Sequence, residues 1–198
     1  RIKKYKNLKL ISWMRYIIFD RDGTLIQYKP YLHDPNQVKL TNGAKNIISN
    51  FLKKGYLLFL HTNQSGVSRG YFKMEDVKQC NNRMIQLLGL GDEIFEDICI
   101  AEDFPPGINS FRKPSTKFGE QLIKKYKIRL DQLIYIGDNI TDLETAFNLN
   151  CQAYGLEKDV ERKLKIQVKN ERRYDFKVFN SLLEIENDII KNDIWNHE

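Results

Sequence analysis

The sequence predicts an α/β fold with a mainly parallel central sheet. Short apolar runs alternate with segments of helical period between residues 16 and 156, a pattern typical of successive βαβ units. Polar clusters directly follow three of the apolar runs, after Phe19, His61 and Ile136. Ligands of such sheets bind at the carboxyl ends of the strands, so these positions also mark the expected site. With 198 residues, 41% of them hydrophobic, the chain can form one domain with a substantial core.

The first half of the chain carries two expected strands and two expected helices. Residues 16–19 form a compact apolar run that ends at a carboxylate, which predicts a buried strand. Five apolar side chains follow helical spacing across residues 42–54, and Gly55 supplies a stop signal. The apolar run at residues 56–61 predicts the next strand, and residues 75–88 predict a helix with one apolar side.

The second half continues this alternation. Residues 98–101 predict a short strand, and four side chains in helical register predict a helix at residues 116–126. A strand at residues 133–136, a short helix at residues 142–147 and a strand at residues 152–156 complete the expected core.

The C-terminal part reads as a connection followed by a closing helix. Residues 157–175 are highly charged and predict a surface connection. Side chains from Phe179 to Ile190 then follow helical spacing and predict a helix that packs on the sheet. We therefore expect one domain over residues 16–198.

Residues 1–15 form a basic leader with six basic residues and no acidic one. The other basic and acidic residues balance, so the net charge of +6 belongs to the leader and the body is formally neutral. We expect a solvated or poorly ordered end; a surface arm, a membrane-surface contact and upstream sequence are the alternatives. Lys9 and Arg15 interrupt any apolar stretch, which argues against a signal peptide. A neutral body does not require a nucleic-acid partner.

The cysteines indicate a reducing compartment. Cys80, Cys99 and Cys151 are few, odd in number and widely spaced, which argues against a disulfide framework. No apolar run is long enough to span a bilayer. We expect a cytoplasmic monomer.

The segment at residues 20–24 (DRDGT) carries the first chemical signal. The preceding strand delivers two carboxylates, Asp20 and Asp22, to its open end, and Gly23 permits a tight turn. A calcium-binding loop can also begin in this way, but it needs a Glu at its twelfth position. That position holds Tyr31, which excludes this interpretation.

Three further motifs follow in order along the chain: residues 62–63 (TN), residues 112–114 (RKP) and residues 137–142 (GDNITD). Together with residues 20–24 they resemble the four motifs of the haloacid dehalogenase-like phosphatase superfamily, over residues 16–156. The resemblance implies a three-layer, Rossmann-like core.

The resemblance also implies roles for the acidic residues. Asp20 is the implied nucleophile that forms an aspartyl-phosphate, and Asp22 the general acid and base. A carboxylate attacking an anionic ester needs a divalent cation, and Mg²⁺ prefers carboxylates together with phosphate oxygens and water. Asp20, Asp138 and the backbone carbonyl of Asp22 are the implied magnesium ligands.

The other motif residues are implied to act on the phosphoryl group. Thr62 and Lys113 bind its oxygens, where fixed donors and positive charge stabilise the transition state. Asp142 orients Lys113 or a metal-bound water. Asn139 stands where a Lys often follows the motif-four aspartate, so the pocket carries less positive charge.

Residues 62–70 (TNQSGVSRG) and residues 40–44 (LTNGA) narrow the resemblance to one branch, the histidinol-phosphate and D,D-heptose 1,7-bisphosphate phosphatases. This branch lacks a large cap domain, so short loops define the substrate pocket. The expected loops are residues 27–39, 64–72 and 102–112. The expected substrate contacts are Asn63, Arg69 and Arg112, because Arg can bind a second phosphate through its planar fork; a structural ion pair is the competing role for Arg69.

The chain departs from this branch in its metal content. Many members carry a Cys/His zinc loop before the third motif, whereas residues 99–112 offer one Cys and no His. A structural zinc site needs four N or S ligands, so we expect no zinc.

The resulting prediction is a Mg²⁺-dependent phosphatase acting on a small phosphorylated metabolite, a sugar bisphosphate first and histidinol phosphate second. Polynucleotide 3′-phosphatases share the same motifs, but the neutral body and Arg21 between the two aspartates argue against a nucleic-acid substrate. A non-catalytic binding protein is disfavoured because Asp20, Asp22, Lys113 and Asp138 are all intact.

Overall fold

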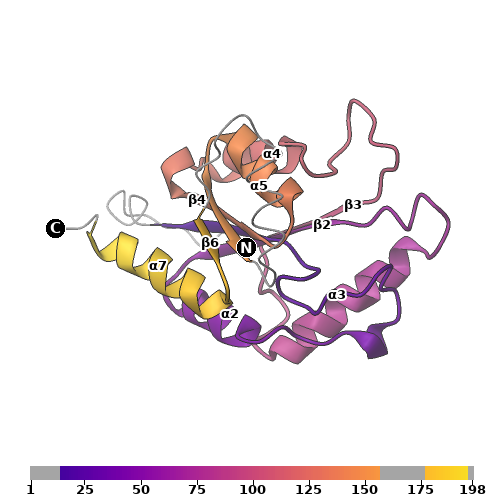
Figure 1. Ribbon diagram of the computed structural model, residues 1–198, viewed down its shortest axis with the longest axis horizontal. Coiled ribbons are helices and arrows are strands. Elements are labelled where there is room, and N and C mark those ends of the chain that lie inside the picture. The colour runs from indigo at the N-terminus through magenta and orange to yellow at the C-terminus, as the bar shows by residue number, and fades with distance from the viewer. Residues whose placement is uncertain (1–13, 157–176, 196–198) are drawn as a thin grey trace.

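A computed structural model describes residues 14–156 and 177–195 (Figure 1). The predicted charged connection lies outside the described residues, and so does all of the basic leader except Met14 and Arg15.

The core is a six-stranded parallel sheet with the strand order β3-β2-β1-β4-β5-β6. This confirms the predicted α/β fold with a parallel sheet. Its strands are β1 (Tyr16–Phe19), β2 (Leu57–Asn63), β3 (Asp97–Ala101), β4 (Leu133–Gly137), β5 (Gln152–Leu156) and β6 (Lys177–Phe179).

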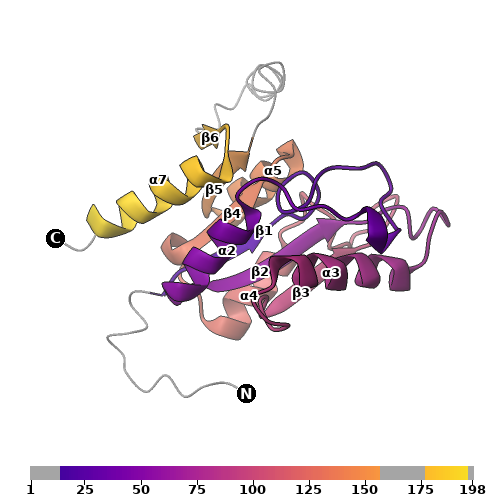
Figure 2. The ribbon, with the colours of Figure 1, turned by 90° about the horizontal axis from the view of Figure 1, so that it is seen from below.

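Helices cover both faces of the sheet and make the fold three-layered. In Figures 1 and 2, α2, α3 and α7 lie on one face, and α4 and α5 lie on the other. The helices are α2 (Ala44–Lys53), α3 (Met74–Leu88), α4 (Lys117–Tyr126), α5 (Ile140–Leu149) and α7 (Leu182–Trp195), with 3-10 turns η1 (Pro35–Gln37) and η2 (Leu130–Gln132).

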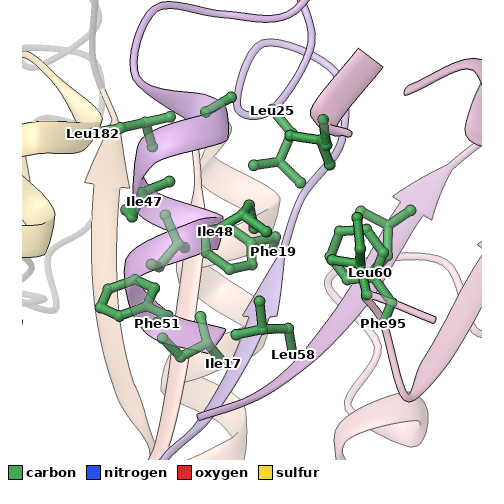
Figure 3. Close-up of a cluster of buried hydrophobic side chains, with 14 of the residues drawn as sticks. Ile17, Phe19, Leu25, Ile47, Ile48, Phe51, Leu58, Leu60, Phe95 and Leu182 are labelled. Carbon is green, nitrogen blue, oxygen red and sulfur yellow. The ribbon is translucent and has the colours of Figure 1, made fainter. Parts of the chain in front are cut away.

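Strand β1 is buried on both faces, which explains its unbroken apolar sequence. Successive side chains of a strand point to opposite faces. Ile17 and Phe19 therefore pack with α2 and α7, whereas Tyr16 and Ile18 pack in the cluster that includes α4. Figure 3 shows the first of these clusters, where side chains of α2 meet β1 and Leu182 of α7 closes the edge.

The C-terminal prediction was partly wrong. Phe179 belongs to the short strand β6, and the closing helix begins only at Leu182. The Phe179 ring stacks on Tyr154 of β5, with centroids 5.9 Å apart, and its backbone pairs with Leu156. A strand of three residues is too short to show a period of its own, so neighbouring helical spacing concealed it.

Several elements extend beyond their predicted bounds by one or more residues. Strand β2 continues to Asn63 and so carries the second motif on regular structure. Helix α5 begins at Ile140, because the Asn139 side chain accepts a hydrogen bond from the Thr141 N–H and caps it.

The strand order positions the site. From β1 the chain moves outward to β2 and β3, then returns to pair β4 with the other side of β1. In open α/β sheets such a reversal opens a crevice beyond the carboxyl ends of the two strands. Asp20 directly follows β1 and Asp138 directly follows β4.

Candidate active site

Strand register brings three of the four motifs together. Phe19 pairs with Leu60 of β2 on one side and with Ile136 of β4 on the other. Asp20 continues this alignment, because its N–H donates to the Ile136 carbonyl at 2.8 Å. The residues at the carboxyl ends of β1, β2 and β4 therefore lie side by side.

Lys113 joins this cluster from the loop before α4. Its Nζ lies 2.5 Å from Asp20 Oδ1 and 2.6 Å from Asp142 Oδ1, and it donates to the His61 carbonyl at 2.9 Å. All three charged groups are buried. Burial disfavours the ammonium form, but Asp142 and Asp20 more than offset this and raise the pKa of Lys113.

The surroundings of Asp20 disfavour the ionised form of its carboxyl group. Burial raises the pKa of its carboxyl group well above the ordinary value, against the opposing effect of Lys113. Asp142, Asp138 and Asp22 add like-charge repulsion in the same direction. A divalent cation bound here would oppose this shift and favour the carboxylate form.

The carboxylates can hold a divalent cation. Ligand oxygens of Asp20, Asp138 and Asp142 all lie within 4.8 Å of one another. Gly23, at a φ of 84°, makes room for this cluster, because a Cβ there would stand 2.0 Å from Asp138 Oδ2. Oxygen ligands and excess negative charge suit Mg²⁺. Asp20 and Asp138, the implied magnesium ligands, thus lie close together, and Asp142, predicted to orient Lys113 or a metal-bound water, pairs with Lys113 directly.

Asp22 is held at the edge of the cluster by donors that sequence reasoning did not assign. Arg21 Nη2 lies 2.9 Å from its Oδ2, Gln64 Nε2 donates to the same oxygen at 2.9 Å, and Thr62 Oγ1 donates at 3.3 Å. Arg21 is fully buried and is anchored by a 2.8 Å hydrogen bond from its Nη1 to Asn81 Oδ1 of α3. The position of Arg21 between two aspartates was the available signal for its role.

Asn63 is partly buried and contacts the backbone of Lys113. Its Nδ2 donates to the Lys113 carbonyl at 3.2 Å, and its Oδ1 accepts from the Lys113 N–H at 2.9 Å. Asn63, predicted as a substrate contact, thus fixes the backbone of Lys113 and also lines the cavity beside Asp22.

His61 supports the same loop and was missed from the sequence. Its Nε2 lies 2.9 Å from the Phe111 carbonyl, which can only accept, so this nitrogen carries the proton. Its Nδ1 then accepts from the Tyr135 hydroxyl at 2.7 Å. Burial, followed by the charge of Lys113, lowers the pKa of His61 to about 3 and keeps the ring neutral.

Arg69 and Arg112 lie together on the loops that flank the site. The guanidinium of Arg69 stacks on the Phe104 ring at 3.5 Å, and that of Arg112 lies 5.8 Å from the same ring. Burial, then the charge of Arg69, lowers the pKa of Arg112. Arg112 Nη1 is buried without a hydrogen-bond partner among the described residues. Within that part of the chain Arg69 forms this stack and no ion pair, which leaves the two cations able to bind an anion.

A cavity of about 260 Å³ opens beside Asp22. Arg21, Asn63 and Gln64 line it together with residues of the segment 28–32. Two of the three predicted pocket loops thus border the cavity.

None of the described helices is both long and apolar enough to cross a bilayer.

The chain has the fold of the haloacid dehalogenase-like class, and its family and relatives identify it as a phosphatase. The chain belongs to the family described as polynucleotide kinase 3 phosphatase, whose match covers residues 15–181.

Two curated relatives extend the comparison. The chain is 34% identical over 134 residues to D-glycero-beta-D-manno-heptose-1,7-bisphosphate 7-phosphatase from Haemophilus influenzae, covering 65% of this chain and 73% of that protein. It is 31% identical over 140 residues to a bifunctional histidine biosynthesis protein from Legionella pneumophila, covering 69% of this chain and 40% of that one.

A solved structure shares the fold. The D,D-heptose 1,7-bisphosphate phosphatase from B. bronchiseptica, complexed with magnesium and phosphate, superimposes with a TM-score of 0.79 at 21% identity. The match covers 90% of this chain and 99% of that one.

Proposed function

We propose that this chain is a Mg²⁺-dependent phosphatase that releases phosphate from a sugar bisphosphate through an aspartyl-phosphate on Asp20. The observation that carries the proposal is the convergence of four charged side chains. The carboxylates of Asp20, Asp138 and Asp142 are close enough to bind one metal ion, and Lys113 pairs with two of them, Asp20 and Asp142. Asp20 and Asp138 would hold Mg²⁺, which when bound neutralises the repulsion between the phosphate ester and the attacking carboxylate.

The chain's own residues account for both the formation and the hydrolysis of the aspartyl-phosphate. A carboxylate oxygen of Asp20 attacks phosphorus, the bond from phosphorus to the ester oxygen breaks, and Asp22 donates a proton to the departing oxygen. Asp22 then removes a proton from water, whose oxygen attacks phosphorus and breaks the bond to Asp20. Lys113 neutralises charge throughout, and Asp142, Asn63 and His61 hold it in place.

The sugar bisphosphate is supported by the relatives and by a second cationic site. The Haemophilus influenzae protein bears the name of a heptose bisphosphate phosphatase. Arg69 and Arg112 form a pair of cations on the flanking loops, and one buried Arg112 nitrogen has no partner among the described residues. Such a pair suits a phosphate that is bound but not cleaved.

A nucleic-acid end is the second candidate, favoured by the description of the matching family. The neutral charge balance of the chain beyond its leader argues against it. Histidinol phosphate remains the alternative metabolite. We further propose a monomeric, single-domain enzyme without zinc. We place it in the cytoplasm, because its three cysteines are free thiols, which suit a reducing compartment.

A phosphate-release assay tests the proposal. Purified protein is given sugar bisphosphates, histidinol phosphate and a 3′-phosphorylated oligonucleotide, each with Mg²⁺ or with EDTA. We expect turnover of a sugar bisphosphate with Mg²⁺ only, its loss by at least about a thousandfold in Asp20→Asn, and wild-type activity in the exposed control Asp92→Asn. Efficient turnover of the oligonucleotide alone would overturn the substrate assignment, and an active Asp20→Asn would overturn the mechanism.

A further inference from the structure

Three tyrosines stand exposed on the loops around the active-site cavity. Tyr28, Tyr31 and Tyr71 are 68%, 48% and 56% exposed. Clustered, exposed aromatic side chains beside a cavity indicate a ligand-binding surface, because folding alone would favour their burial.

Tyr28 and Tyr31 belong to the same cavity as the proposed general acid. Both line the space beside Asp22, together with Asn63 and Gln64. A group bound in this cavity would therefore lie beside both these rings and Asp22.

Tyr31 is held in a fixed orientation. Its backbone has a φ of 52°, which is unusual for a residue other than Gly and costs free energy that surrounding contacts must offset. Its ring meets the ring of Tyr71 at a right angle in a T-shaped contact, with centroids 4.8 Å apart. Its carbonyl accepts from His33 Nδ1 at 2.8 Å, and the His33 ring stacks on Phe72.

These contacts do not require Tyr28 or the exposed face of Tyr31. Phe72 is buried, and a Cβ on Gly66 would stand 2.2 Å from its ring, so the His33–Phe72 stack already joins the two loops. The exposed surface of Tyr28 and Tyr31 is therefore not needed to pack the two loops against each other. Strained backbone and unburied aromatic surface at one site together indicate a binding role.

We propose that Tyr28 and Tyr31 form a stacking platform that selects the closed-ring form of the sugar bisphosphate over open-chain phosphates. This rests on the function proposed above. A pyranose ring presents a face of C–H groups that packs on an aromatic ring, while the tyrosine hydroxyls can hydrogen-bond its hydroxyl groups. An open chain has no such face and would lose rotational freedom on binding.

The test compares a ring with a matched chain. Glucose 1,6-bisphosphate, closed by its anomeric phosphate, and glucitol 1,6-bisphosphate are measured as competitive inhibitors of p-nitrophenyl phosphate hydrolysis with Mg²⁺. The informative variant is Tyr31→Gly, because Gly tolerates the positive φ and removes the ring without adding strain. We expect its inhibition constant for the cyclic compound to rise about three- to tenfold, with little change for glucitol 1,6-bisphosphate.

Two controls separate the platform from a general disturbance. Tyr31→Phe retains the ring and should restore most of the preference for the cyclic compound. Leu183→Ala removes another exposed apolar side chain, on α7, and should leave both inhibition constants unchanged.

Equal changes for the two compounds in Tyr31→Gly, no change in either, or no preference in the wild type would overturn the platform. These outcomes differ from failure of the proposed function, which appears as absent phosphate release by the wild type. Weaker turnover of a 3′-phosphorylated oligonucleotide in Tyr31→Gly, without an effect on the sugar, would assign the rings to a nucleobase and also overturn the proposal.

Discussion

At the scale of single residues, Lys113 determines whether the acidic cluster can exist. Its ammonium group lies between the buried carboxylates of Asp20 and Asp142. A buried charge is tolerated when it is paired, whereas removing one partner leaves an uncompensated charge in a poorly solvated site.

We expect Lys113→Met to lower the free energy of unfolding by about 3–5 kcal/mol, because two buried carboxylates lose their counter-charge. Denaturant unfolding in EDTA measures this change. In the double variant Lys113→Met/Asp142→Asn part of the loss should be recovered, since one of the stranded charges is gone. Simple additivity of the two single changes would contradict the pairing.

His61 gives a prediction about pH. Its pKa in the folded protein is about 3, against an ordinary value of 6.5. Between these values the unfolded chain binds a proton that the folded chain does not, so stability falls as the pH is lowered through this window. The contribution of His61 is at most about 1.4 kcal/mol per pH unit.

His61→Gln should therefore flatten the dependence of the unfolding free energy on pH between 6.5 and about 4, even where its absolute stability is lower. Urea unfolding at several pH values provides the measurement, with the exposed His33→Gln as the matched control. An unchanged slope in His61→Gln would contradict a buried neutral imidazole.

At the scale of elements, the ends of helices and strands position the catalytic groups. Helix α5 is capped by Asn139, and the Asp142 side chain in its first turn accepts from the Asn139 N–H at 2.9 Å. One capping arrangement thus starts the helix and orients the carboxylate that meets Lys113. Asn139, which stands where a Lys often follows the motif-four aspartate, thus orients Asp142.

Helices α4 and α5 approach each other closely at Gly119. A Cβ at this position would stand 2.3 Å from Leu149 Cδ1. Ala is favoured over Gly in a helix by about 1 kcal/mol, but overpacking costs about 1–3 kcal/mol. We expect the second effect to prevail, so that Gly119→Ala lowers stability.

Thermal and denaturant unfolding of a double-mutant cycle checks this contact. In a Leu149→Ala background the obstruction is absent, and Gly119→Ala should become neutral or stabilising. A stabilising effect of Gly119→Ala in the wild-type chain would show that the helices are farther apart than described.

At the scale of the whole molecule, we expect the acidic cluster to lower the stability of the folded state until a cation binds. Burial raises the pKa of Asp20, and like-charge repulsion from Asp142, Asp138 and Asp22 raises it further. A ligand that binds only the folded state adds about 2.7 kcal/mol at a hundred times its dissociation constant.

We therefore expect Mg²⁺ to raise the melting temperature of the wild type, and EDTA to reverse the rise. Asp138→Asn should melt higher than the wild type in EDTA, because one repulsive charge is removed, yet gain little from Mg²⁺. Differential scanning calorimetry decides, and an equal response of both proteins to Mg²⁺ would exclude Asp138 as a ligand.

The sequence by itself determined most of the elements and the chemical types at their ends. Periodicity in segments such as residues 42–54 is a local property, so it predicted α2 within two residues at its start. The acids and the lysine were identified by their motifs, because each motif occupies a few adjacent residues.

Only the tertiary structure decided which of these groups touch. Asn63 clamps the backbone of Lys113 across 50 positions, and Arg21 reaches Asn81 across 60. The strand β6 exists because β5 offers it a partner. Such contacts depend on the register between distant segments, which no local pattern of side chains encodes.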